Sequence, residues 1–135
     1  QLLEDTLIGN FLLPYSGSIS KRLVRSPKFY LFDLGVKRAI GQKLKSPILP
    51  QSNEYGSAFE HFLINEIIHL SRYKENDYDF MFFRTSNDAE VDLVIKKPTG
   101  EIVALEIKSG EDPNPSGLSG LKSLQKLLPQ TNLVC

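Results

Sequence analysis

The chain has 135 residues, of which 41% are hydrophobic and 24% are charged, and its formal net charge is zero. This composition predicts one globular domain with a sizeable core, and the neutral balance argues against a diffuse nucleic-acid-binding surface. No apolar run is long enough to span a bilayer, no signal peptide opens the sequence, and the single Cys135 excludes an internal disulfide, so we expect a cytoplasmic protein with no membrane contact.

The charges are unevenly distributed along the chain. Residues 1–50 hold eight lysines or arginines and three acidic residues, a balance of +5, which leaves −5 for residues 51–135. Four of the cations lie close together: Lys21, Arg22, Arg25 and Lys28. A solvated surface that the acidic remainder attracts is the simplest interpretation, and binding of nucleic-acid phosphates or of a partner domain stays open.

The first half of the chain predicts short elements. We expect a strand or short helix over residues 2–13, a strand over 28–32, and a helix over 34–41 that Asp33 caps. Residues 42–53 contain two prolines and indicate a linker. We therefore expect two parts, residues 1–50 as a basic α+β extension and residues 51–135 as the core domain.

The clearest helix covers residues 54–72 and has more than one apolar stripe, so it should be well buried. Glu60 lies on the packed side of this helix, where a carboxylate is unfavourable unless it is paired or binds a metal. The alternative for Glu60 is a glutamate near the helix start that the helix dipole favours. Glu66 is a second candidate on a face expected to be exposed. We interpret His61 and His69 as surface or boundary residues, not as zinc ligands.

A strand over residues 80–84 leads to a predicted hairpin, whose two alternating runs flank the turn residues 98–100. Val91, Leu93 and Ile95 should share one face of the first strand, with Asp92 on the other face. A three-residue loop places Asp92 opposite Glu106, whereas a two-residue loop places it opposite Leu105 and breaks the pattern of apolar faces. The three-residue loop is therefore favoured.

The rest of the chain predicts a loop over residues 109–117, an amphipathic helix over 118–128 and a strand over 131–135. A helix between two strands forms a crossover, so the last strand should run parallel to the second hairpin strand. The expected fold class is α/β, with a mixed central sheet flanked by helices.

The two facing carboxylates, Asp92 and Glu106, are oxygen ligands of the kind that Mg²⁺ prefers, and Lys108 lies on the same face. A cross-strand ion cluster neutralised by Lys108 is the simpler alternative. Glu90 also shares this face and is interpreted as a charge at the rim.

Five segments of the sequence, read in order, carry a resemblance to a known superfamily: residues 25–35, 56–60, 83–86, 89–92 and 105–109. The aspartate, the hairpin and the following Glu-x-Lys resemble the core of the PD-(D/E)xK nucleases, which have the restriction-endonuclease-like fold. The five segments taken together are similar to a domain of unknown function found C-terminal to P-loop ATPases in prokaryotes. The resemblance covers nearly the whole chain, and it implies an upstream ATPase module as a partner. The sequence has no phosphate-binding loop of its own, and we expect a fragment truncated at one or both ends.

The resemblance implies a metal-dependent nuclease-like domain that hydrolyses phosphodiester bonds in DNA or RNA. Asp92, Glu106, Glu60 and the Ile107 carbonyl would hold Mg²⁺ or Mn²⁺, and Lys108 would orient the attacking water. The competing hypothesis is an inactive module that binds nucleic acid or protein and regulates the ATPase, because a fold does not guarantee a function.

Overall fold

In a computed structural model of the chain, the described residues are 8–15, 26–110, 118–128 and 133–134. Their elements, in chain order, are β1 (Gly9–Pro14), β2 (Lys28–Leu31), α3 (Leu34–Ile40), α4 (Asn53–Tyr73), β3 (Asp79–Arg84), β4 (Glu90–Lys96), β5 (Ile102–Leu105), α5 (Ser119–Leu127) and β6 (Leu133–Val134). The mixed α/β class and the predicted order of a long helix, three strands, a helix and a strand are confirmed.

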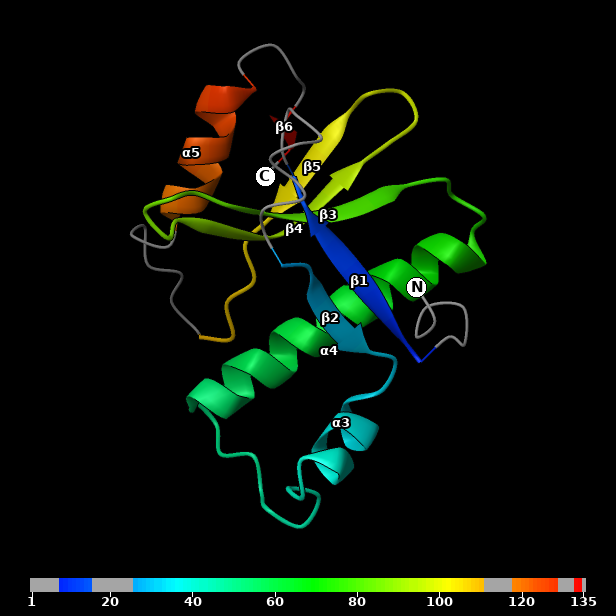
Figure 1. The fold of residues 1–135 in the computed structure, drawn as a ribbon, viewed down its shortest axis with the longest axis vertical. Coiled ribbons are helices and arrows are strands. Elements are labelled where there is room, and N and C mark those ends of the chain that lie inside the picture. Colours follow the sequence, from blue (N-terminus) through cyan, green and yellow to red (C-terminus); the bar gives the residue numbers. More distant parts are fainter. Residues whose placement is uncertain (1–7, 16–25, 111–117, 129–132, 135) are drawn as a thin grey trace.

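The strands of the described residues form one six-stranded sheet, in the order β2-β1-β3-β4-β5-β6 (Figure 1). β3, β4 and β5 are antiparallel neighbours, while β1 runs parallel to β3 and β6 runs parallel to β5. The parallel pairing of the last strand confirms the expected crossover. The sheet also runs across the boundary expected near residue 50, because β1 and β2 form one side of it.

Helices cover the two faces of the sheet. On one face, Ile64 and Ile68 of α4 pack with strand residues such as Leu12 and Leu93. On the other face, Leu124 of α5 packs with a second cluster of buried strand residues. α4 is the long helix that crosses behind β1 and β2 in Figure 1, and α5 lies beside the opposite part of the sheet. No described helix has the length and apolar character to cross a membrane.

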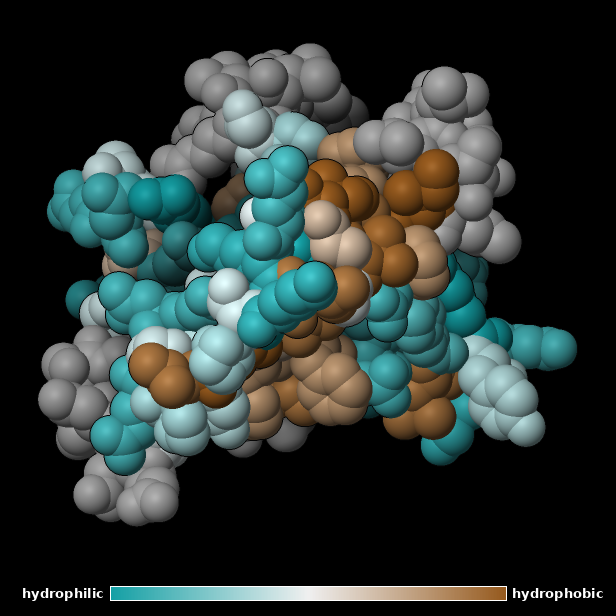
Figure 2. Space-filling model, turned by 90° about the horizontal axis from the view of Figure 1, so that it is seen from below, coloured by the Kyte–Doolittle hydropathy of each residue, from teal (hydrophilic) through white to brown (hydrophobic). Residues whose placement is uncertain are grey.

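Local sequence signals account for the two first helices. Asp33 caps α3 by accepting a hydrogen bond from the Val36 amide at 2.7 Å, as predicted. Ser52 caps α4 in the same way, with its hydroxyl accepting from the Tyr55 amide at 3.1 Å. α3 buries none of its residues and lies on the underside of the molecule, which exposes hydrophilic and hydrophobic side chains side by side (Figures 1 and 2).

The β4–β5 hairpin has the predicted register. Its ladder pairs Leu93 with Leu105 and Lys96 with Ile102. The Lys97 amide then bonds the Glu101 carbonyl at 2.9 Å, which leaves a loop of three residues. Gly100 closes this loop with a φ of 87°, a conformation that glycine adopts without strain.

The predicted alternation within β4 is wrong at one point. Met81 of β3 pairs with Val94 and Phe83 pairs with Val91, so β4 advances three residues while β3 advances two. This bulge places Val91 in the cluster beneath α5, whereas Leu93 lies in the cluster beneath α4. Asp92 lies within the bulge, so its side chain does not follow the regular alternation of a strand.

The expected position of His61 is also wrong. Its side chain is 1% exposed, although a surface or boundary position was expected. Its Nε2 lies 2.8 Å from the Leu31 carbonyl oxygen, and its Nδ1 lies 3.2 Å from Lys37 Nζ. Burial lowers the pKa of His61. A neutral ring that donates from Nε2 and accepts at Nδ1 satisfies both contacts, so His61 is a buried link between α4, β2 and α3. His69 is exposed, as expected.

Candidate carboxylate and lysine site

The candidate site lies where β4 and β5 separate. The ladder between them ends at the Leu93–Leu105 pair, and Glu106, Ile107 and Lys108 follow the end of β5 without strand pairing. Asp92 occupies the gap, because its Oδ2 accepts a hydrogen bond from the Ile107 amide at 2.7 Å. The predicted strand thus ends three residues early, and the last segment is held by a side chain instead of a backbone ladder.

Asp92 is buried, with 8% of its surface exposed. Burial raises the pKa of Asp92 to about 6, the hydrogen bond from the Ile107 amide acts against this shift, and the charges of Glu106 and Glu60 add to it. Glu106 and Glu60 are thus near enough to influence the ionisation of Asp92. That these three carboxylates hold one metal ion stays a prediction.

Glu106 and Lys108 form a direct ion pair. Lys108 Nζ lies 2.5 Å from Glu106 Oε1. The hydrogen bond to Glu106 raises the pKa of Lys108, which keeps this half-exposed side chain protonated near neutral pH. Glu106 Oε2 is buried and has no hydrogen-bond partner among the described residues. A buried carboxylate oxygen is unfavourable without a donor or a cation, so this atom is a candidate ligand for one.

Glu60 reaches the site from α4. Its Oε1 accepts a hydrogen bond from the Tyr30 hydroxyl at 2.6 Å, and Lys28 Nζ lies 3.5 Å from the same oxygen. Burial, and then the hydrogen bond to Glu60, raises the pKa of Tyr30 above its usual range, so Tyr30 remains a donor. A Cβ added at Gly56, one turn before Glu60, would lie 3.5 Å from Ser109 Oγ, so this part of α4 lies against the segment that follows Lys108.

Lys28 is the unexpected member of the site. It forms ion pairs with Glu90 and Glu60, and its Nζ lies 5.5 Å from the centre of the Phe82 ring. Burial alone would lower the pKa of Lys28, but the hydrogen bond to Glu90 and the nearby carboxylates outweigh burial and raise the pKa. Lys28 had been grouped with Lys21, Arg22 and Arg25, which lie outside the described residues; here it neutralises the carboxylates.

The two remaining acidic candidates, Glu90 and Glu66, do not contact Asp92 or Glu106 in any hydrogen bond or ion pair of the described residues. Glu90 pairs with Lys28, and its Oε2 also lies 3.7 Å from Arg84 Nε, in agreement with a charge at the rim. Glu66 is exposed on α4. The sequence did not predict that Lys28 and Tyr30 lie beside the carboxylates, because they reach α4 from β2, a strand that is distant from it in the sequence.

The donor set suits a hard divalent cation. Asp92, Glu106 and Glu60 offer carboxylate oxygens, and Glu106 Oε2 has no hydrogen-bond partner among the described residues. No group of three or more His, Cys, Asp or Glu side chains in the described part of the chain is already arranged around one metal position. A cation here would therefore be held by fewer protein carboxylates, with water or substrate supplying the other ligands.

Comparison with known proteins identifies the family. A model of the "Domain of unknown function (DUF4143)" matches residues 55–135, and the chain belongs to this family. The match begins at Tyr55, in the first turn of α4, and includes Glu60, Asp92, Glu106 and Lys108, while Lys28 lies before it.

Two curated relatives have no described activity. The uncharacterized protein Mb2031c of Mycobacterium bovis and the uncharacterized protein Rv2008c of Mycobacterium tuberculosis are each 29% identical to the chain over 114 residues. These residues are 84% of this chain, and the chain spans about a quarter of the length of each relative (25%). No solved structure gives a significant match.

Proposed function

We propose that the domain hydrolyses phosphodiester bonds in nucleic acid with the help of a divalent cation, as the nuclease module of a longer ATPase-containing protein. The observation that carries this proposal is the buried Glu106 Oε2, which has no hydrogen-bond partner among the described residues, beside Asp92, whose pKa burial raises to about 6. Mg²⁺ or Mn²⁺ would give this oxygen a partner and would favour the charged form of Asp92. The resemblance to PD-(D/E)xK nucleases names the same residues.

In this proposal the residues have separate roles. Asp92 and Glu106 would hold the cation together with water or substrate oxygens, and Glu60 and the Ile107 carbonyl are the further ligands that the resemblance implies. When bound, such an ion polarises a phosphate and lowers the pKa of a coordinated water. Lys108 orients the attacking water and stabilises negative charge on the phosphate, because its pairing with Glu106 keeps it protonated. A literal general base is a poor role for Lys108 for the same reason.

The test is cleavage of plasmid DNA and of single-stranded DNA and RNA in Mg²⁺ or Mn²⁺. We expect Asp92→Asn to reduce cleavage to the level seen in a chelator. Asp79→Asn is the matched control, since Asp79 is an exposed carboxylate at the start of β3, and it should cleave as the wild type does. Wild-type protein that binds Mn²⁺ but cleaves none of these substrates would contradict the proposal.

A second candidate is a non-enzymatic module that binds nucleic acid or protein. The observation in its favour is the Lys28 ammonium, which already neutralises Glu60 and Glu90 without a metal. Absence of any Mn²⁺ binding heat at millimolar metal, with oligonucleotide present, would favour this second candidate.

A further inference from the structure

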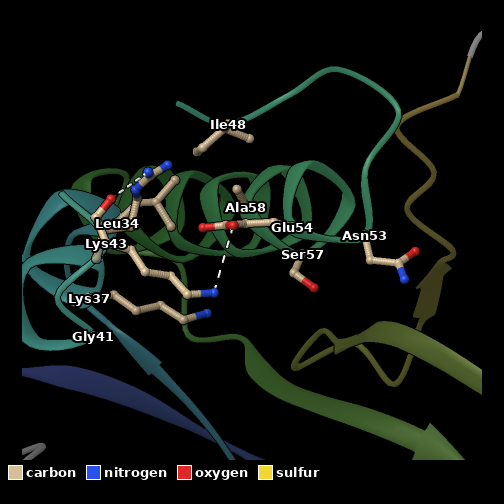
Figure 3. Close-up of a pocket in the computed structure, with 10 residues that line it drawn as sticks. Leu34, Lys37, Gly41, Lys43, Ile48, Asn53, Glu54, Ser57 and Ala58 are labelled. Carbon is tan, nitrogen blue, oxygen red and sulfur yellow. Dashed lines mark hydrogen bonds and ion pairs between the residues drawn. The ribbon is translucent and has the colours of Figure 1, made fainter. Parts of the chain in front are cut away.

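A basic pocket lies between α3, the segment that follows it, and the first turns of α4 (Figure 3). Its volume is about 530 Å³. Three cations line it, Lys37, Arg38 and Lys43, against one carboxylate, Glu54. In Figure 3 the ammonium groups of Lys37 and Lys43 point into the same space beside α4. The pocket therefore has an excess of positive charge in a chain of zero net charge.

The contacts of these cations leave their charge largely uncompensated. Arg38 Nη2 donates to two backbone carbonyl oxygens, of Lys43 at 2.8 Å and of Ser46, which fixes the segment after α3 but does not neutralise the guanidinium. Lys37 contacts the ring of His61, whose lowered pKa keeps it neutral. Lys43 Nζ lies 3.7 Å from Glu54 Oε2, a long pairing between two exposed side chains.

A short series of contacts joins this pocket to the carboxylate site. Lys37 contacts His61, the His61 ring lies 5.3 Å from the Tyr30 ring, and the Tyr30 hydroxyl bonds Glu60. Ser57 lines the pocket and lies three residues before Glu60 on α4. Only two side chains thus separate a lysine of the pocket from a carboxylate of the site.

We propose that this pocket binds backbone phosphates of a nucleic-acid strand that passes the Asp92–Glu106 centre. This inference rests on the proposed function, because it supplies the substrate contacts that the acidic centre lacks. Lysine ammonium groups are suited to phosphate oxygens as flexible point charges. A nucleic-acid strand presents phosphates repeatedly along its length. One phosphate can therefore bind in the basic pocket while another lies at the acidic centre, which a single free phosphate cannot do.

The experiment measures binding of a fluorescent single-stranded oligonucleotide by anisotropy, in a chelator so that cleavage plays no part. Lys43→Gln removes a positive charge and should weaken binding about fivefold at about 0.1 M salt, with the salt slope reduced by about 0.7 for one lost phosphate contact. Glu54→Gln removes the opposing charge and should strengthen binding. Damage to the fold does not strengthen binding, so the pair of opposite shifts identifies the pocket.

Two exposed residues outside the pocket supply matched controls: Lys126→Gln on α5 and Glu66→Gln on the outer side of α4 should change affinity by less than the pocket variants. Equal effects of Lys43→Gln and Lys126→Gln would overturn the proposal in favour of general charge attraction. If inorganic pyrophosphate binds to the wild type but not to Lys43→Gln, and displaces no oligonucleotide, the pocket binds a small anion and the proposal is overturned. Pocket-dependent binding without cleavage in Mn²⁺ would retain the pocket and reject the nuclease function.

Discussion

The Asp92 carboxyl is buried at a strand bulge, and the charges of Glu106 and Glu60 act on it, so its charged form is unfavourable in the folded chain. Its folded pKa of about 6 lies above its ordinary value of 3.8. The folded state consequently holds a proton at Asp92 more tightly than the unfolded state does. Protonation of Asp92 therefore stabilises the fold. This stabilisation is complete below about pH 4 and is lost as the pH rises through about 6.

We predict that Asp92→Asn removes this pH dependence. The rise of the pKa from 3.8 to about 6 corresponds to about 3 kcal/mol. Between about pH 4 and pH 7 the wild type should lose up to this amount of unfolding free energy relative to the variant. Urea unfolding of both proteins at several pH values measures the difference. A constant difference over this range would show that Asp92 ionises normally in the fold.

Lys28 allows a second test of the same charges. Lys28→Met keeps an apolar side chain of similar length but removes the ammonium group that pairs with Glu60 and Glu90 and lies over the Phe82 ring. We expect lower stability near neutral pH, because two partly buried carboxylates lose their partner, and tighter Mn²⁺ binding by calorimetry, because the ion then meets no competing ammonium.

Lys97→Met is the control for the Lys28 variant, since Lys97 pairs with Glu101 at 2.8 Å on the hairpin, away from the site. It should alter neither stability nor metal binding measurably. Weaker Mn²⁺ binding in Lys28→Met than in wild type would show that Lys28 supports the metal and does not compete with it.

At the scale of elements, α5 packs closely on β4 through a glycine. A Cβ built on Gly120 would lie 1.8 Å from the Glu90 carbonyl oxygen and 2.5 Å from its carbonyl carbon. Backbone atoms cannot move aside as a flexible side chain can. Gly120 therefore fixes how near α5 approaches the strand that carries Asp92 and Glu90.

We predict that Gly120→Ala lowers the free energy of unfolding by about 2 kcal/mol or more, because α5 must shift outward and lose contacts of Leu124. Gly110→Ala is the matched control, since an added Cβ there meets nothing within 4 Å. Thermal or urea unfolding measures both. A Gly120 variant as stable as the control would contradict the close packing.

The same elements show what the sequence could predict. The register of the hairpin was predictable, because local turn residues and two alternating runs specify it. The bulge in β4 was not, because Val91, Leu93 and Ile95 alternate regularly and only the partner strand β3 reveals the extra residue. The burial of His61 and the contacts of Lys28 with carboxylates were not predictable for a related reason. The partners of His61 lie 24 to 30 residues away in the chain and Glu90 lies 62 residues from Lys28, beyond what local patterns report.

At the scale of the molecule, the segments before and after residue 50 share one sheet and one core. Leu12 and Tyr30 are buried in the cluster that also contains Ile64 and Leu93. β1 pairs with β3, so its removal would expose the edge of β3.

We predict that residues 51–135 alone, which contain the whole family match, do not fold cooperatively. The free β3 edge and the uncovered α4 face should cause aggregation or a loosely packed state, visible as non-cooperative thermal unfolding and loss of near-ultraviolet circular dichroism. Residues 1–135 are the control. A cooperative transition of the shorter chain would support two separate domains instead.

Tyr30 gives the site a spectroscopic property of its own. The chain contains no tryptophan, so its intrinsic fluorescence comes from five tyrosines. The Tyr30 hydroxyl donates to Glu60, and a carboxylate acceptor quenches the emission of the phenol that bonds it. Any ligand that draws the Glu60 carboxylate away releases this quenching, so the unlabelled domain can report occupancy of its own site through light emission.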